Sequence, residues 1–455
     1  MFRKIPGGIC ETIFLTEAVA KYPCPLSKRT ILVWNSRDFH ARNFQKCPFR
    51  KYLPPKTCST FTGRLRYTAR MQPYRYVVPT EIHFGAGISG TVWEHCGGWG
   101  EKPLLVTGRR SARASGLMGR ILGQFPHAEV FEGVPENPDT AVCERGAAAC
   151  RAAQCDWVIG VGGGSAMDVA KAIALLVRNP GACADYFSSQ RRARPALPIV
   201  AVPTTAGTGS EVTPYAVLVD AQAHSKRTIR GRDLFPRAAF LDPEATTGMA
   251  PSITAATGLD ALSQAMEGML SKQSTPIGDA LALEACRLIA QWLPRAVCQG
   301  GDLDARGAML HAAMLSGCII AQSGTTLVHG MGYYFTLEFG LPHGLANALL
   351  LSPVFEMNAR HEPEKVAALA TALGHPAAPT PAEAAAAIRK ALHSLLRQVG
   401  ISPAARDVGV AESALDRFAA DICNDPYRFK NQVGRFTVDD VRRLFCCAWS
   451  GEAVG

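Results

Sequence analysis

Short apolar runs alternate with helical stretches between Met71 and about residue 250. The runs KPLLVTG (102–108), DWVIGVGGGS (156–165) and LPIVAVPTT (197–205) are rich in aliphatic residues and end in Gly, Ser or Thr. Helical stretches such as MDVAKAIALLV (167–177) lie between them. Strands that alternate with helices in this way predict a parallel α/β sheet.

The pattern changes near Pro251 to long segments rich in Ala and Leu. Segments 279–293 (DALALEACRLIAQWL) and 381–400 (PAEAAAAIRKALHSLLRQVG) are typical of helices. A chain of 455 residues is also long for one hydrophobic core. We therefore predict an α/β domain over residues 71–250 and an all-helical domain over 251–455.

Residues 1–70 differ from the rest of the chain and show no sustained period of 2 or 3.6. They hold 14 of the 48 Lys and Arg residues but only 3 of the 38 Asp and Glu residues. A transit peptide has such a composition, but 70 residues is long for one and the amphipathic pattern is poor. We predict a disordered or dispensable extension.

Charge and cysteine usage narrow the class of protein. The net charge of +10 belongs to the extension, since the remaining residues carry 34 basic and 35 acidic side chains. This balance argues against a nucleic-acid partner. The lack of an uninterrupted apolar run of about 18 residues argues against a membrane span. Fifteen cysteines without CxxC spacing indicate reduced thiols and a cytoplasmic protein.

A loop with three consecutive glycines, Gly162, Gly163 and Gly164, follows the strand at 156–161. We predict that a helix opens at Ser165, with Asp168 as its capping partner. Glycines let a backbone approach a ligand closely, and a helix N-terminus offers N–H groups to a phosphate. The GxGxxG fingerprint is incomplete, because Ser165 replaces its last glycine. Phosphate binding and a tight structural turn both remain open here.

A second loop, PTTAGTGSEVT (203–213), follows the next strand along the chain. It places hydroxyl groups around two glycines, at Thr204, Thr205, Thr208 and Ser210. Parallel sheets bind nucleotides at the carboxyl ends of their strands. Two such loops together predict a nucleotide site.

These loops belong to an ordered series of motifs. GGGSAMDVAK and PTTAGTGSEVT are followed by AFLDPE (239–244), GLDAL (258–262) and LVHGMG…LPHGLANA (327–348). In this order they resemble the iron-containing alcohol dehydrogenase family, from about Val77 to the C-terminus. The resemblance implies a Rossmann-like N-terminal domain that binds the dinucleotide and an all-α C-terminal domain that binds metal and substrate, the architecture shared with dehydroquinate synthase.

The resemblance also implies a set of cofactor-binding residues. The glycine loop would touch the pyrophosphate, Asp168 would shape that loop, the hydroxyl-rich loop would line the nicotinamide, and Lys226 would lie near the ribose. The residues carried over are Gly108, Asn137, Gly162, Gly163, Gly164, Ser165, Asp168, Thr204, Thr205, Thr208, Ser210 and Lys226.

The choice between NAD and NADP depends on Gly108. Members that prefer NAD carry an Asp at this strand end, where it binds the ribose 2′-hydroxyl. Here Gly108 is followed by Arg109 and Arg110, which could bind a 2′-phosphate. We predict NADP(H), with NAD(H) as the alternative.

The metal site departs from the pattern of the family, which uses one Asp and three His. Asp260, His329 and His343 match three ligands, while Gln264 occupies the position of the remaining histidine. Residues four apart share one helix face, so Gln264 can offer its amide oxygen beside Asp260. Two histidines and one carboxylate suffice for Fe(II) or Zn(II), and we predict a bound metal of reduced affinity.

The implied activity is hydride transfer between NAD(P) and a small alcohol or aldehyde in a cytoplasmic homo-oligomer. Tyr333, where many members carry histidine, could relay a proton, although a packed aromatic is the favoured role. One alternative is a metal-independent ketone or keto-acid reductase, in which His329 and His343 would donate hydrogen bonds to the carbonyl. Further alternatives are a lyase resembling dehydroquinate synthase and a nucleotide-binding protein without turnover.

Overall fold

The structure is a computed structural model that describes residues 73–187, 194–220 and 225–454. The predicted extension over residues 1–70 lies outside the described residues. The described residues belong to one compact unit, which spans residues 63–455.

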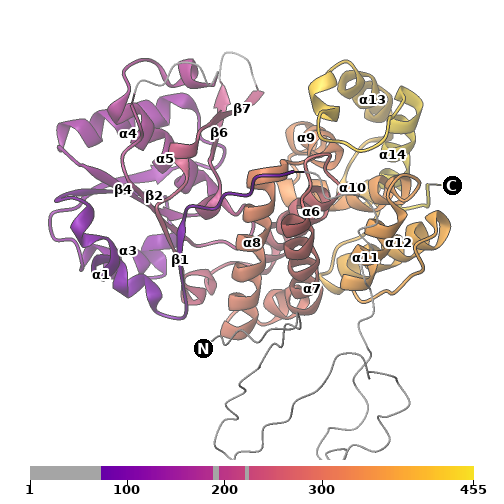
Figure 1. The fold of residues 1–455 in the computed structure, drawn as a ribbon, viewed down its shortest axis with the longest axis horizontal. Coiled ribbons are helices and arrows are strands. Elements are labelled where there is room, and N and C mark those ends of the chain that lie inside the picture. Colours follow the sequence, from indigo (N-terminus) through magenta and orange to yellow (C-terminus); the bar gives the residue numbers. More distant parts are fainter. Residues whose placement is uncertain (1–72, 188–193, 221–224, 455) are drawn as a thin grey trace, which may run out of the picture. The chain divides into compact units, whose positions relative to one another are not determined.

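A six-stranded parallel sheet forms the first half of this unit, as predicted (Figure 1). Its strand order is β1-β8-β5-β4-β2-β3. The three strands expected from the apolar runs are present as β2, β4 and β5. The strands of the sheet are β1 (Glu81–Phe84), β2 (Pro103–Gly108), β3 (Glu129–Val134), β4 (Trp157–Gly162), β5 (Ile199–Pro203) and β8 (Ala238–Leu241).

Helices cover both faces of the sheet, which explains its continuous apolar strands. In β4 every residue is buried, because alternate side chains pack against opposite helical layers. One layer contains α1 and α3 and the other contains α4 and α5 (Figure 1). The helices of this half are α1 (Val92–Cys96), α2 (Ser111–Ala114), α3 (Leu117–Leu122), α4 (Thr140–Ala152) and α5 (Gly164–Arg178).

The order of the strands locates a binding edge. From β2 the chain crosses to β3 on one side, whereas from β4 it crosses through α5 to β5 on the other side. The connections therefore diverge between β2 and β4. In doubly wound sheets ligands bind outside the carboxyl ends of the strands at such a switch point.

A two-stranded antiparallel hairpin, β6 (Tyr215–Asp220) and β7 (Ser225–Arg230), was not predicted. In β7 the sequence SKRTIR is mostly exposed and lacks the apolar alternation that marks a half-buried strand. The hairpin forms because β6 packs on α5 and pairs with β7 along its whole length. Tertiary contacts thus determine this element.

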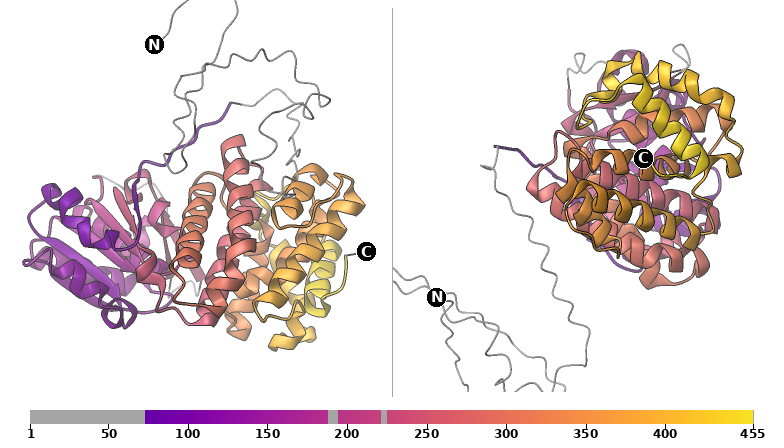
Figure 2. Two further views of the ribbon diagram at one scale, coloured as in Figure 1. Left: turned by 90° about the horizontal axis from the view of Figure 1, so that it is seen from below. Right: turned by 90° about the vertical axis from the view of Figure 1, so that its right-hand side faces the viewer.

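The second half of the unit is built from helices, as predicted (Figure 2). The segments expected at 279–293 and 381–400 lie within α7 and α12. Proline opens α6, α7, α11 and α12, where its missing N–H costs nothing. The helices are α6 (Pro251–Met269), α7 (Pro276–Cys298), α8 (Leu303–Ser323), α9 (Leu327–Phe339), α10 (His343–Asn358), α11 (Pro363–Ala372), α12 (Pro381–Gln398), α13 (Leu415–Cys423) and α14 (Val438–Ser450).

Two further expectations concern helices and thiols. Within the described ranges, no helix is long and apolar enough to cross a membrane. The cysteines in these ranges are unpaired, including the adjacent Cys446 and Cys447.

Candidate active site

The glycine loop at the end of β4 leads directly into α5. This helix begins at Gly164, with Gly163 as its N-cap and no side-chain cap. The predicted capping pair of Ser165 and Asp168 is therefore wrong. The Asp168 carboxylate instead accepts hydrogen bonds from Ser210 Oγ at 2.6 Å and from the Val217 N–H at 3.0 Å. The first N–H groups of α5 remain available to an anion.

The two predicted loops meet at the sheet edge. A Cβ on Gly164 would lie 2.8 Å from Thr208 Oγ1, and one on Gly163 would lie 3.4 Å from Thr205 Oγ1. The Thr204 N–H donates to the Gly162 carbonyl at 2.9 Å. Glycine is thus required at position 164 by the close approach of the hydroxyl-rich loop.

A buried lysine that sequence reasoning missed ties these loops together. Lys171 Nζ donates to Ser210 Oγ at 2.7 Å, to Thr213 Oγ1 at 3.2 Å and to the Tyr215 carbonyl at 2.8 Å. Burial lowers the pKa of Lys171 to about 8, against the attraction of Asp168 and Glu211. Ser210 is therefore engaged inside the protein. Lys171 is the last residue of the motif GGGSAMDVAK, three residues after Asp168. This spacing, which places both side chains on one helix face, could have identified it.

The structure places Gly108 and Asn137 at the same sheet edge. Gly108 ends β2, and a Cβ on Gly162 of the neighbouring β4 would lie 3.9 Å from its nitrogen. Arg109 and Arg110 follow it and are exposed. Asn137 follows β3 and is exposed, with a φ of 50° that asparagine tolerates better than most residues.

Lys226 lies on β7 and points toward the helical half. Its Nζ lies 5.7 Å from the centre of the Tyr333 ring, within the range of a cation–π contact. Burial lowers the pKa of Lys226, while Asp260 and Asp168 oppose that shift. The side chain expected near the ribose therefore faces the helices that carry the metal-ligand candidates.

Three helices bring the predicted metal ligands together. Asp260 lies on α6, His329 on α9 and His343 at the start of α10. One ligand atom from each lies within 4.8 Å of the others. His329 Nε2 lies 3.6 Å from Asp260 Oδ1, and the two imidazole centres are 5.2 Å apart.

The pKa values of Asp260, His329 and His343 depend on one another. Burial alone would raise the pKa of Asp260, but hydrogen bonding from His329 and the nearby His343 hold it below its usual value. Burial would lower the pKa of His329, yet Glu267 and Asp260 raise it to about 10. Burial lowers the pKa of His343 to about 4, and neighbouring His329 and Lys226 reinforce this. His343 therefore presents a neutral imidazole.

Gln264 stands beside Asp260, as its spacing predicted. Its Nε2 donates to Asp260 Oδ2 at 3.0 Å. Its Oε1 is buried and accepts no hydrogen bond from any described residue. A buried amide oxygen without a donor loses solvation, so a cation beside it would satisfy the group.

Glu267, fully buried on α6, was missed by sequence reasoning. Its Oε1 accepts from the Thr326 N–H and hydroxyl at 2.8 Å each, and its Oε2 contacts His329 Nδ1. A carboxylate on one imidazole nitrogen leaves the other directed at a metal. Glu267 lies seven residues after Asp260, two helical turns along the same face, which was a usable signal.

Asn347 and Gly344, both within LPHGLANA, were also missed. Asn347 Nδ2 lies 3.3 Å from Asp260 Oδ1 and 3.2 Å from His343 Nε2, so it links the two candidates. A Cβ on Gly344 would lie 1.9 Å from the Ala256 carbonyl oxygen. The glycine after His343 is thus required for α10 to approach α6.

Tyr333 packs beside the cluster. Its ring centre lies 5.3 Å from that of His343, and Arg428 lies 5.5 Å from the ring. Burial raises the pKa of the Tyr333 hydroxyl, against the opposite effect of Arg428. A raised pKa keeps the hydroxyl protonated at neutral pH, so little phenolate is present to act as a base, which supports a packing role.

The residues present fit a divalent metal. The donor set of two imidazoles and a carboxylate suits Fe(II) or Zn(II). Three buried polar atoms at this point, on Gln264, His343 and Asn347, find no hydrogen-bond partner within the described ranges. Of these, the Gln264 oxygen belongs to the side chain that donates to Asp260, so a cation held by Asp260 would lie near a buried acceptor that has no donor.

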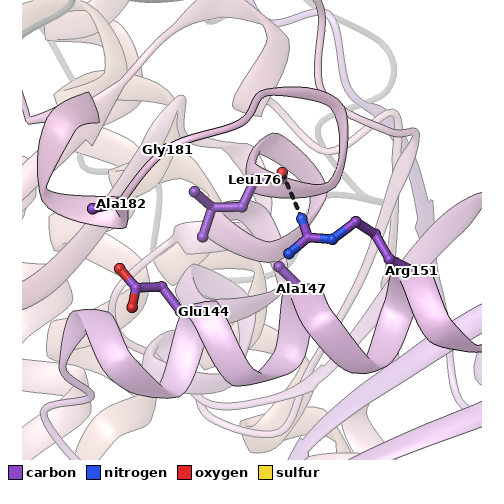
Figure 3. Close-up of a pocket in the computed structure, with 6 residues that line it drawn as sticks. All are labelled: Glu144, Ala147, Arg151, Leu176, Gly181 and Ala182. Atoms are coloured by element: carbon purple, nitrogen blue, oxygen red, sulfur yellow. Dashed lines mark hydrogen bonds between the residues drawn. The ribbon is translucent and has the colours of Figure 1, made fainter.

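A pocket elsewhere on the α/β half does not involve these residues. It has a volume of about 240 Å³ and lies between α4, the last turn of α5 and the chain that follows α5 (Figure 3). In it, Arg151 Nη1 donates to the Leu176 carbonyl at 3.1 Å. Since none of the predicted site residues lines it, we do not assign it to the active site.

Comparison with known proteins identifies relatives of the whole described unit. The family model "Iron-containing alcohol dehydrogenase" matches residues 79–243, and "Fe-containing alcohol dehydrogenase family, C-terminal" matches 254–449. Alcohol dehydrogenase 4 of Schizosaccharomyces pombe is 32% identical, over 85% of this chain and 92% of its own length. The 1,3-propanediol dehydrogenase of Klebsiella pneumoniae is 35% identical, over 79% of this chain and 94% of its own length.

Solved structures agree with this match. A 1,3-propanediol oxidoreductase superposes with a TM-score of 0.78 at 34% identity, over 83% of this chain and 100% of the other. The sulfoacetaldehyde reductase of Bifidobacterium kashiwanohense, solved with NAD+, superposes with a TM-score of 0.74 at 31% identity, over 84% and 100%.

Proposed function

The chain belongs to the iron-containing alcohol dehydrogenase family and is an oxidoreductase acting on CH–OH groups, and from this premise we propose its reaction. It transfers hydride between a nicotinamide dinucleotide and a small primary alcohol or its aldehyde, assisted by Fe(II) or Zn(II). The observation that carries the proposal is the convergence of Asp260, His329 and His343 beside Tyr333 and Lys226.

The helical residues prepare the metal centre. When bound, a divalent metal would polarise the carbonyl or lower the pKa of the alcohol, and the nicotinamide would supply or accept the hydride. Glu267 holds His329 through Nδ1, so that Nε2 faces Asp260. Asn347 orients both Asp260 and His343 through its amide. Side chains fixed in this way need little reorganisation during the reaction.

The α/β residues would hold the dinucleotide. The uncapped N–H groups at Gly164 and Ser165 suit the pyrophosphate, and Asp168 with Lys171 keeps the hydroxyl-rich loop against them. The NAD+ complex of the reductase relative supports a nicotinamide dinucleotide as the cofactor. Lys226 would place a positive charge between the two halves of the site, beside Tyr333.

Gly108 is proposed to set a preference for NADP(H). Gly108→Asp is expected to lower kcat/KM with NADPH about tenfold relative to NADH, because the carboxylate would repel the 2′-phosphate. A Cβ here would lie 3.8 Å from the Val134 carbonyl, so the substitution fits. Gly119→Asp, on open α3, adds the same charge as a matched control. An unchanged ratio of kcat/KM in Gly108→Asp would place the 2′-position elsewhere.

Gln264 is proposed to bind the metal weakly through its amide oxygen. Gln264→His is expected to tighten Zn(II) binding at this site about tenfold or more, because imidazole nitrogen is a better donor than an amide oxygen. Isothermal titration calorimetry gives the affinity. Gln264→Leu, which removes the donor, should weaken binding. Equal affinities in all three proteins would exclude residue 264 from the metal.

The proposed reaction is tested by metal analysis together with activity. Purified protein is assayed with NADH and NADPH on a panel of small aldehydes, before and after treatment with a chelator. Loss of activity with the chelator and its return with Fe(II) or Zn(II) are expected. Activity that survives complete metal removal would favour the metal-independent reductase, and inactivity toward every carbonyl would favour nucleotide binding without turnover.

We also propose a homo-oligomer in the cytoplasm. Exposed large apolar side chains support self-association, since Leu337 and Tyr427 are 66% and 73% exposed. The unpaired cysteines are those expected in a reducing compartment. Sedimentation velocity of the full chain tests the first point, and a purely monomeric protein would exclude it.

A further inference from the structure

A second cluster of metal-ligating side chains lies on the α/β half, at the edge strand β1. Glu81 and His83 are two residues apart on β1 and so share one face. His95, on the short helix α1, lies over the same face, with its ring centre 4.0 Å from that of His83. These three residues come from elements distinct from the helices that hold Asp260.

The geometry of this cluster suits one ion. One ligand atom of each side chain lies within 4.8 Å of the other two. His83 Nε2 lies 3.3 Å from Glu81 Oε1. Phe240, the partner of His83 in the β1–β8 register, stacks beneath His83 at 4.5 Å with an interplanar angle of 9°. The stacking holds the imidazole in a fixed plane.

His83 offers a buried nitrogen whose hydrogen-bonding capacity is unused. Its Nε2 is buried and makes no hydrogen bond of good geometry with any residue in the described ranges. A neutral imidazole with an available lone pair is the form that binds a metal.

We propose that Glu81, His83 and His95 form a second metal site, which binds Zn2+. Two imidazoles and one carboxylate are a zinc donor set with an open fourth position, whereas Mg2+ and Ca2+ prefer oxygen ligands throughout. Cys96 is adjacent to His95 in sequence but does not belong to the cluster. The ion would cross-link β1 to α1 and stabilise this corner of the sheet.

The test is Zn2+ titration of the reduced, chelator-treated full chain in a His343→Ala background, which removes a ligand of the first site. One equivalent of Zn2+ is expected to bind to the Glu81 cluster and raise the melting temperature. Adding His95→Ala should remove this equivalent and the thermal shift. His127→Ala, an exposed histidine outside both clusters, is the matched control and should remove neither. Thiols elsewhere in the chain are common to all variants and cancel in the comparison.

Two results would overturn the proposal. One is the same Zn2+ stoichiometry with and without His95→Ala, and the other is equal binding of Mg2+ and Zn2+. If the His343→Ala background does not fold, the comparison is made between wild type and His95→Ala, where the stoichiometry should fall by one. Because the two clusters share no residue, failure here leaves the proposed reaction untouched.

Discussion

Replacing His343 with alanine is expected to lower kcat/KM about a thousandfold, since a Lewis-acid metal supplies several kcal/mol of transition-state stabilisation. The variant keeps only Asp260 and His329 as strong ligands of the first site, so that site should no longer hold a metal. The helix should survive, because His343 is the first residue of α10 and its Nδ1 makes no hydrogen bond with a described residue.

Metal binding and activity are measured separately to check this. Zn2+ titration in a His95→Ala background isolates the site of Asp260, His329 and His343. The His95→Ala protein should bind one equivalent of Zn2+ there, and the His95→Ala, His343→Ala double variant should bind none. His127→Ala serves as the control for loss of an imidazole, and thermal melting confirms folding. Retention of both metal and activity in a folded His343→Ala protein would exclude this residue as a ligand.

Glu267→Gln is expected to weaken metal binding about 10- to 100-fold, the usual effect of losing a carboxylate that supports a histidine ligand. The amide keeps the size of the side chain but removes the charge beside His329 Nδ1. It also changes a group that accepts hydrogen bonds from Thr326. Glu267 is thus a positioning residue, and its loss should reduce kcat/KM along with metal affinity.

Glu284→Gln is the matched control, because Glu284 is a half-exposed carboxylate that pairs with Arg287 on the outer part of α7. The Zn2+ dissociation constant and kcat/KM are measured for both variants, with melting temperature as the check on folding. If saturating metal restores kcat/KM in Glu267→Gln, the substitution acts on metal affinity. A Glu267→Gln protein that binds Zn2+ as tightly as wild type would contradict the role given to Glu267.

The order of the sequence motifs identified the candidate metal ligands on the helices. The packing of those helices then explained why Gly344 follows His343. Asp260, His329 and His343 could be named because their motifs are short and local. The helices that carry them meet only in the fold, and Gly344 is needed because α10 approaches the Ala256 carbonyl. Spacing along one helix did predict the contact between Gln264 and Asp260.

Buried polar partners were harder to find. Lys171 and Glu267 look like ordinary helical residues in sequence, and their roles come from groups that are distant along the chain. The capping pair of Ser165 and Asp168 failed for the same reason, since Asp168 finds better partners in Ser210 and Val217. Local propensity was overridden by tertiary hydrogen bonds.

The sequence by itself determined the parallel sheet, the helical second half and the two loops, because hydrophobic periodicity and glycine chemistry act over a few residues. The tertiary structure decided which of these segments meet. It formed the polar β6–β7 hairpin, turned Lys226 toward Tyr333 and brought Glu81, His83 and His95 together across β1 and α1. Such contacts depend on long-range packing, where burial and electrostatic partners outweigh the preference of any single segment.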